Sequence, residues 1–329
     1  MDSPLSPASA ISERLNALPA DATLAFVFPG QGSQKTGMGK EVRAASAAAR
    51  DVFAIADEAA GFALCELCAN GPDDELTRTD NAQPAILATS LAVLAAALES
   101  AAIASRPAFV AGHSLGEYTA LVAAGSLDIA SAVRLVRERG RLMGAATQGT
   151  LAAVVGLDEA TVAAICAEAG AEVANYNAPT QTVVGGTREA VERACTLAKE
   201  RGGRGLPVNV SGAFHTSLME AAAHHFAAIL DSEHIGHPGI AVVGNVSAEP
   251  LTMTEQVRAD LAMQIRSPVR WYQSMNHLEA NGVRRVIEIG PGKVLTSQLK
   301  RSNPNLECVA LDEAAALGSF ESLRMSGNV

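Results

Sequence analysis

The chain has 329 residues, of which 48% are hydrophobic and 18% charged, so it can fill a sizeable core and is not a disordered chain. Its formal net charge is −10, which argues against a nucleic-acid binder, because such proteins normally carry a basic stripe. No stretch supplies the ~18 apolar residues that a membrane span needs, and the N-terminus lacks the basic region of a signal peptide. The five cysteines are scattered and complete no metal site, which suggests a reducing compartment. The cysteines and the missing signal peptide together predict a cytoplasmic protein.

The chain begins with residues 1–22, which we expect to be a flexible N-terminal tail. A short apolar run at 23–28, closed by Pro29-Gly30, is typical of a buried strand that ends in a sharp turn. Helical patterns and one more buried strand follow; the helices are expected at 40–60, 84–100, 118–124 and 129–145, and the strand at 108–111. Strands that alternate with helices imply a parallel sheet covered on both faces.

The pattern changes after residue 146. Six elements follow in the order β-α-β-β-α-β, which is the ferredoxin-like unit. Its strands are expected at 151–155, 172–177, 181–184 and 205–210, and its helices at 159–169 and 187–201. The first pattern then resumes, with strands at 240–246 and 285–289 and a helix at 293–301. The sequence therefore predicts an α/β fold in which a large α/β-hydrolase-like subdomain with a parallel sheet (23–146 and 211–329) carries an inserted ferredoxin-like subdomain (147–210).

The strongest chemical signal is the pentapeptide from Gly112 to Gly116, GHSLG. A G-x-S-x-G between a strand and a helix is typical of a nucleophile elbow, in which a tight turn lifts a serine hydroxyl above the sheet. Both glycines are needed because the turn brings neighbouring backbone too close for side chains. The helix that follows directs its N-terminal N–H groups towards a developing oxyanion. Ser114 is therefore the candidate nucleophile.

An activated serine needs a base, and the chain offers seven histidines. His113 adjoins the serine, so its side chain should leave the turn in another direction, whereas His224 and His225 lie in a helical pattern. His215 follows the last strand of the insert, where the chain re-enters the large subdomain. It is the favoured candidate, although the residues alone do not decide among the histidines.

Two further features suit acyl chemistry. The loop 29–34 satisfies neither the P-loop nor the dinucleotide fingerprint, because its glycines are wrongly spaced, but its exposed backbone amides could supply an oxyanion donor. In the helix 129–145, Arg134, Arg137 and Arg141 share one side, whereas Arg139 points elsewhere. An inward arginine needs a partner, and a substrate carboxylate held bidentately is one possibility.

Together these residues resemble the malonyl-CoA:acyl carrier protein transacylase family over nearly the whole chain, from about Leu24 to Leu311. The motifs that carry the resemblance are FPGQGSQ (28–34), QPAI (83–86), GHSLGEY (112–118), VRLVRERG (133–140), GAFH (212–215), SPVRW (267–271) and GPGKVL (290–295). The resemblance implies malonyl transfer from malonyl-CoA to the phosphopantetheine thiol of an acyl carrier protein by a ping-pong mechanism, through a malonyl-serine ester. It implies no metal and no other cofactor.

The resemblance also implies roles for individual residues. Ser114 would be the nucleophile and His215 its general base, oriented by the main-chain carbonyl of Gln264. The backbone N–H groups of Gln31 and Leu115 would form the oxyanion hole. In the substrate pocket, Arg139 would bind the malonyl carboxylate, Gln83 would line the wall, and the ring of Phe214 would crowd an α-methyl branch.

Alternatives remain open from the sequence. An acyl hydrolase of the same fold would have no use for a carboxylate clamp, and a trans-acting polyketide acyltransferase would carry another extender unit. A non-catalytic docking module is a third possibility. We expect a monomer whose acidic carrier protein docks on basic residues near the cleft, with Lys300, Arg301, Arg201 and Arg204 as candidates.

Overall fold

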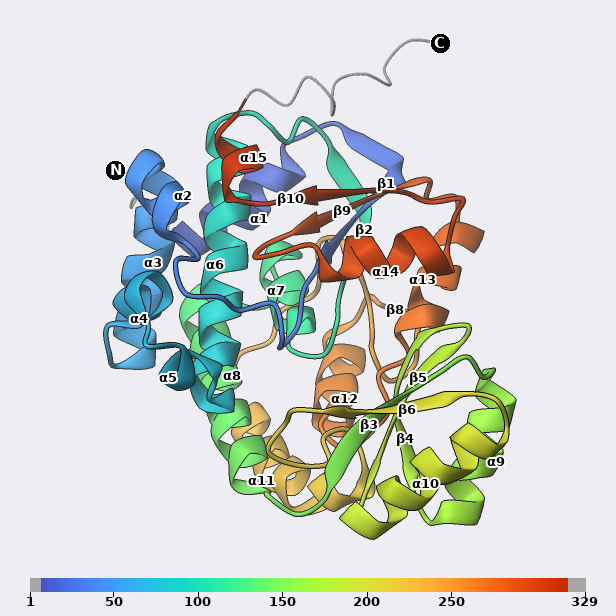
Figure 1. The fold of residues 1–329 in the computed structure, drawn as a ribbon. Helices are drawn as coiled ribbons and strands as arrows, with labels where there is room; N and C mark the ends of the chain where they lie inside the picture. Colours follow the sequence, from blue (N-terminus) through green and yellow to red (C-terminus); the bar gives the residue numbers. More distant parts are fainter. Residues whose placement is uncertain (1–6, 319–329) are drawn as a thin grey trace.

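The computed structural model describes residues 7–318 and has two subdomains, each built on its own β-sheet (Figure 1). The sheet of the large subdomain has the strand order β10-β9-β1-β2-β7-β8, and every neighbouring pair is parallel except β7 and β8. Its strands are β1 (Ala20–Phe28), β2 (Arg106–Gly112), β7 (Ala241–Val243), β8 (Pro250–Leu251), β9 (Arg285–Ile289) and β10 (Glu307–Leu311).

Alternate residues of the central strand β1 face two separate hydrophobic cores. Leu24, Phe26 and Phe28 pack into the larger core, whereas Ala25 and Val27 pack into the smaller one. This alternation follows from the two-residue period of a strand, and it explains why a strand buried on both faces is a continuous apolar run.

Helices cover both faces of this sheet. Those that contribute buried residues to the larger core are α1 (Pro7–Asn16), α2 (Lys40–Ala45), α3 (Ala47–Ala60), α4 (Leu64–Asn70), α5 (Asp73–Thr77), α6 (Thr79–Glu99), α7 (Gly116–Ala123), α8 (Ile129–Ala145), α11 (Glu220–Ser232), α12 (Thr254–Gln264) and α15 (Glu313–Leu317), with the short 3-10 helix η1 (Ser217–Met219). Those that cover the smaller core are α13 (Trp271–Ala280) and α14 (Val294–Ser302).

The sheet of the small subdomain has four antiparallel strands in the order β4-β5-β3-β6, which is the arrangement of a ferredoxin-like unit. Its elements are β3 (Thr150–Val155), α9 (Glu159–Ala169), β4 (Glu172–Ala178), β5 (Gln181–Gly186), α10 (Arg188–Glu200) and β6 (Arg204–Val208). The predicted fold class, a parallel-rich α/β sheet with a separate antiparallel sheet, is confirmed.

Strand β4 also fastens the small subdomain to the large one. The N–H of Tyr176 donates to the carbonyl of Val269 at 2.8 Å, and the N–H of Val269 donates to the carbonyl of Ala174 at 2.9 Å. Val269 precedes α13 by two residues, so this ladder joins the edge of the small sheet directly to the large subdomain.

Three sequence expectations need correction. Residues 7–22, predicted as part of a flexible tail, form α1 and the start of β1, because Ile11 and Leu15 pack into the larger core; residues 1–6 lie outside the described part. The single helix expected at 40–60 is two helices, because Ser46 has an extended backbone and caps α3. The helix expected from Pro84 begins at Thr79, so the proline lies inside α6.

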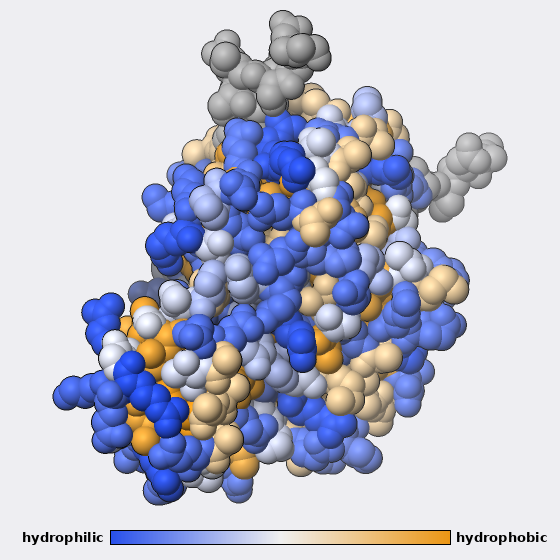
Figure 2. Space-filling view, turned by 90° about the vertical axis from the view of Figure 1, so that its right-hand side faces the viewer, coloured by the Kyte–Doolittle hydropathy of each residue, from blue (hydrophilic) through white to orange (hydrophobic). Residues whose placement is uncertain are grey.

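The expectation that no stretch is long and apolar enough for a membrane span also needs correction, because α6 meets that test by length and composition; 94% of the relevant stretch is buried inside the protein. It packs against α3 and α8 as a core helix. On the face shown in Figure 2, hydrophobic residues gather mainly in the lower part of the view, where the small subdomain lies, and the large subdomain above is mostly hydrophilic.

Candidate active site

Ser114 lies in the turn between β2 and α7, and its backbone adopts a positive φ of 52°. A positive φ is uncommon for a residue with a side chain, and it persists only where the surroundings enforce it. The surroundings here are close backbone: a Cβ at Gly112 would lie 1.9 Å from the carbonyl carbon of Gly116, and one at Gly116 would lie 2.2 Å from the carbonyl oxygen of Phe28. The prediction that both elbow glycines are required is confirmed.

His215 lies beside Ser114, in the segment that leads from the small subdomain back into the large one. Its Nε2 lies 2.8 Å from Ser114 Oγ, and its Nδ1 lies 2.8 Å from the main-chain carbonyl oxygen of Gln264. A carbonyl can only accept, so Nδ1 carries the proton and Nε2 is free to accept one from the serine. His215 also has a positive φ, 62°, and its N–H donates to the carbonyl of Ile265.

The environment of His215 keeps the imidazole neutral. Burial and the nearby positive charge of Arg139 lower its pKa to about 3, although the hydrogen bond to Gln264 acts in the opposite direction. The ring is therefore unprotonated at neutral pH and has the form that a general base requires.

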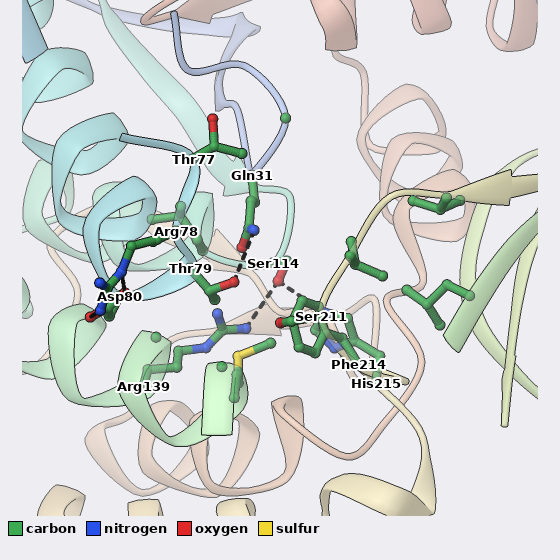
Figure 3. Close-up of a pocket in the computed structure, with 18 of the residues that line it drawn as sticks. Gln31, Thr77, Arg78, Thr79, Asp80, Ser114, Arg139, Ser211, Phe214 and His215 are labelled. Atoms are coloured by element: carbon green, nitrogen blue, oxygen red, sulfur yellow. Dashed lines mark hydrogen bonds and ion pairs between the residues drawn. The ribbon is translucent and has the colours of Figure 1, made fainter. Parts of the chain in front are cut away.

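Arg139 is the second fully buried group of the site, with a side chain that is only 1% exposed. Its Nη2 donates to Ser114 Oγ at 2.9 Å (Figure 3). The same Nη2 donates to Gln264 Oε1 at 2.9 Å, and Nη1 donates to Gln83 Oε1 at 2.9 Å. All three acceptors are neutral, and no described carboxylate lies within ion-pair distance of this guanidinium. The structure therefore holds a buried cation without an anionic partner.

The other arginines of α8 behave as the helical spacing predicts. The Arg134 and Arg141 side chains are 49% and 58% exposed and form ion pairs with Glu233 and Glu138. Only Arg139 is turned inward, towards the serine.

The predicted oxyanion donors lie beside the serine on two loops. Leu115 is the residue after Ser114, and Gln31 lies in the turn that follows β1, with its side-chain amide donating to Thr79 Oγ1 at 3.2 Å (Figure 3). Within residues 7–318, the backbone N–H groups of Gln31 and Leu115 have no hydrogen-bond acceptor. Both donors are available to an oxygen that bears negative charge.

A cavity of about 750 Å³ opens between the two subdomains, and Ser114, Arg139, His215 and Phe214 line it together with Gln31. Phe214 is 5% exposed, so its ring forms part of a packed wall. The expectation that Gln83 lines this cavity is wrong: its side chain is fully buried and holds Arg139 from behind.

Sequence reasoning missed three contacts behind the elbow. Asn245 Oδ1 accepts from the N–H of Ser114 at 2.7 Å, and Asn245 Nδ2 donates to the carbonyl of Gly112 at 2.7 Å. Gln264 uses its side chain as well as its carbonyl, since Nε2 donates to Glu117 Oε2 at 2.6 Å. The strand expected at 240–246 covers Asn245, whereas β7 ends at Val243 and leaves Asn245 in the loop beside the elbow, so the prediction could not suggest its role. Nothing in the spacing indicates the partner of Glu117.

Comparisons with known proteins show that this chain is similar to acyl transferases. Residues 25–321 match the family model of the acyl transferase domain. The malonyl CoA-acyl carrier protein transacylase of Bacillus subtilis (strain 168) is 44% identical over 299 residues, which are 88% of this chain and 93% of that protein.

Solved structures agree. The acyl carrier protein S-malonyltransferase of Vibrio cholerae superposes with a TM-score of 0.86 at 41% identity, covering 90% of this chain and 98% of that one. A malonyl-transacylase in complex with its type II polyketide acyl carrier protein gives a TM-score of 0.86 at 38% identity, covering 91% and 99%.

Proposed function

Because this chain belongs to the acyl transferase domain family, and within it to the malonyl-CoA:acyl carrier protein transacylases, we propose that it transfers malonyl through an ester on Ser114. The donor is malonyl-CoA and the acceptor is the phosphopantetheine thiol of an acyl carrier protein. The observation that carries the choice of acyl group is the buried guanidinium of Arg139, which lies 2.9 Å from Ser114 Oγ and has no carboxylate partner within residues 7–318.

In the first half-reaction, Ser114 Oγ attacks the thioester carbon while its proton passes to His215 Nε2. The carbonyl oxygen becomes an oxyanion, which the N–H groups of Gln31 and Leu115 can stabilise. The C–S bond then breaks, and the coenzyme A sulfur leaves with the proton held by His215. The malonyl group remains as an ester on the serine.

In the second half-reaction, the phosphopantetheine thiol enters the same cavity and loses its proton to His215. The thiol sulfur attacks the ester carbon through the same oxyanion geometry, and Ser114 leaves with the proton returned by the imidazole. The two half-reactions are mirror images, so one set of residues serves both. Since these residues supply proton transfer and charge stabilisation, we propose that no metal or redox cofactor takes part.

The carboxylate clamp favours transfer of malonyl over uncharged acyl groups. A malonyl carboxylate is separated from its thioester carbon by a single methylene, so its cationic partner has to lie next to the nucleophile. Arg139 does so, and an anion there would offset the cost of burying the guanidinium alone. An acyl hydrolase working on uncharged chains would gain nothing from this residue.

The carrier-docking surface remains a prediction. None of the four basic candidates, Lys300, Arg301, Arg201 and Arg204, lines the cavity, and Arg201 is paired with Glu168. Reversing these charges tests the patch: it is supported if the KM for the carrier rises far more than the KM for malonyl-CoA, and contradicted by equal effects. We also propose that the protein acts as a cytoplasmic monomer, where its five free cysteines stay reduced.

The central test uses labelled malonyl-CoA with and without carrier protein. The wild-type chain should form a labelled ester on Ser114 that persists in buffer and disappears when a fatty-acid or polyketide carrier is added. Ser114→Ala should form none. An ester that hydrolyses in buffer as fast as it transfers would support the hydrolase, and continued transfer by Ser114→Ala would refute the scheme.

A further inference from the structure

A buried carboxyl group, that of Glu117, lies behind the serine and takes no part in the proposed chemistry. It belongs to α7, directly after the second elbow glycine, and its side chain is fully buried. Glu117 Oε2 accepts from Gln264 Nε2 at 2.6 Å and from the backbone N–H of Asn245 at 3.2 Å. Its partners are thus the two residues that contact Ser114 from behind.

Gln264, which donates to Glu117, also contacts Ser114, Arg139 and His215. The carbonyl of Gln264 holds His215 Nδ1, its Oε1 accepts from Arg139 at 2.9 Å, and its Nε2 donates to Glu117 and to the carbonyl of Ser114. A side-chain amide has one accepting end and one donating end. If it turned over, its NH₂ would face the guanidinium of Arg139, so its orientation decides whether the arginine is held or repelled.

Glu117 is itself in contact with Asp260 of α12. Both carboxyl groups are buried, and two neighbouring buried carboxylates repel each other, so a proton on one of them is favoured. Glu117 Oε1 has no hydrogen-bond donor within the described residues, whereas Asp260 accepts from the N–H of Val246. Burial and the Asp260 charge raise the pKa of Glu117 well above its ordinary value, in keeping with a proton on Oε1.

We propose that Glu117, which accepts from Gln264 Nε2, is a positioning residue that fixes the amide of Gln264 with its oxygen towards Arg139. The proposal rests on the proposed function and adds a residue that tunes selectivity for a carboxylate-bearing acyl group. Glu117 touches neither substrate nor reacting atoms, so its effect passes through Gln264 and Arg139.

The chain offers variants that separate this role from simple packing. Glu117→Gln keeps an accepting oxygen for Gln264 and replaces the O–H with an N–H that can donate to Asp260, so it imitates the protonated acid. Glu117→Ala removes both functions, and Glu117→Met removes them while filling most of the volume. Glu288→Ala is a matched control, because Glu288 is also buried and accepts from the N–H groups of Leu295 and Thr296, outside the cavity wall.

The measured quantity is the ratio of kcat/KM for malonyl-CoA to that for acetyl-CoA in the acylation of Ser114, with the melting temperature of each variant. Losing one buried hydrogen bond to the clamp should lower this ratio about 10-fold in Glu117→Ala and Glu117→Met. Glu117→Gln should stay near the wild-type ratio, and Glu288→Ala should lose melting temperature without changing the ratio.

The proposal is overturned if Glu117→Met keeps the wild-type ratio, if Glu117→Gln loses it to the same extent, or if Glu288→Ala changes it equally. If Glu117→Ala does not fold, the ratio measured for Glu117→Met decides. A wild-type chain that forms no malonyl ester would instead refute the proposed function, so the two failures are distinct.

Discussion

The guanidinium of Arg139 donates a hydrogen bond of 2.9 Å to the same Ser114 oxygen that lies 2.8 Å from the imidazole of His215. The cation therefore contacts the serine hydroxyl directly. A hydroxyl that accepts from a cation is a poorer nucleophile, so an incoming carboxylate that takes over the guanidinium would also free the serine. We therefore expect binding of the malonyl carboxylate and activation of Ser114 to be linked through Arg139.

Substituting Arg139 should separate these effects. We expect Arg139→Ala to lower kcat/KM for malonyl-CoA about 100-fold, because a bidentate, charge-assisted pair is lost. Acylation by acetyl-CoA, which has no carboxylate, should change much less. Steady-state kinetics with both thioesters measures the difference. Arg134→Ala, on the exposed side of the same helix, is the control and should leave both rates unchanged; equal losses with both thioesters would argue against a carboxylate clamp.

The low pKa of His215 predicts an unusual pH profile. A base with the ordinary histidine pKa near 6.5 would lose activity below that pH as it becomes protonated. Because burial and Arg139 lower the pKa of His215 to about 3, kcat/KM should stay level as the pH falls from 7.5 to about 5. A decline centred near pH 6.5 in the folded enzyme would contradict this environment.

The same argument predicts the direction in which a substitution of Arg139 shifts the pKa of His215. Replacing Arg139 by Gln removes the positive charge that disfavours imidazolium, so the pKa of His215 should rise. Titration of labelled histidine by NMR, with His215→Asn to assign the signal, measures the change directly. An unchanged or lower pKa in Arg139→Gln would show that the two groups do not interact.

Phe214 should set the tolerance for branched malonyl groups. Its ring is packed into the cavity wall beside His215, where an α-methyl substituent would compete for space. Phe214→Ala should therefore raise the kcat/KM for methylmalonyl-CoA relative to malonyl-CoA by about 10-fold, the value of one methyl group in a pocket. A competition assay with both thioesters measures the ratio, and Phe53→Leu, in the core away from the cavity, should not alter it.

The elbow glycines should be intolerant of any side chain. An added Cβ at Gly112 would meet backbone atoms of Gly116, which cannot move without displacing α7, so Gly112→Ala should cost about 3 kcal/mol or more. Gly144, near the end of α8, is the control: a Cβ there comes no nearer than 3.7 Å to Thr79, and alanine favours a helix. Chemical denaturation measures both variants, and equal stabilities would contradict the steric argument.

Sequence reasoning succeeded where a pattern is local. Helix α8 has the predicted bounds because Asp128 caps its first turn and its apolar positions repeat regularly. Likewise, Ser114 could be identified because strand, glycine turn and helix are consecutive in the chain. The resemblance to a family then pointed to His215, Arg139 and the carbonyl of Gln264, which the structure brings together.

It failed where a position depends on distant parts of the chain. The helix α1 is short, and it exists because Ile11 and Leu15 pack into a core whose other residues lie far away in sequence. The contact between Glu117 and Gln264 spans 147 positions, and no periodicity reports it. Gln83 illustrates the same limit: a motif identified it, but only the packing of α6 against α8 shows that it supports Arg139 rather than the cavity wall.

The backbone ladder between β4 and Val269 has a consequence for engineering. Val269 follows Gln264 by only five positions, so the edge of the small sheet and the carbonyl that orients the imidazole belong to one short stretch of chain. Exchanging small subdomains between relatives to change acyl preference would disturb that stretch unless the hydrogen bonds of Ala174 and Tyr176 were kept. The junctions of a chimaera should therefore lie outside β4, so that the hydrogen bonds between β4 and Val269 are kept.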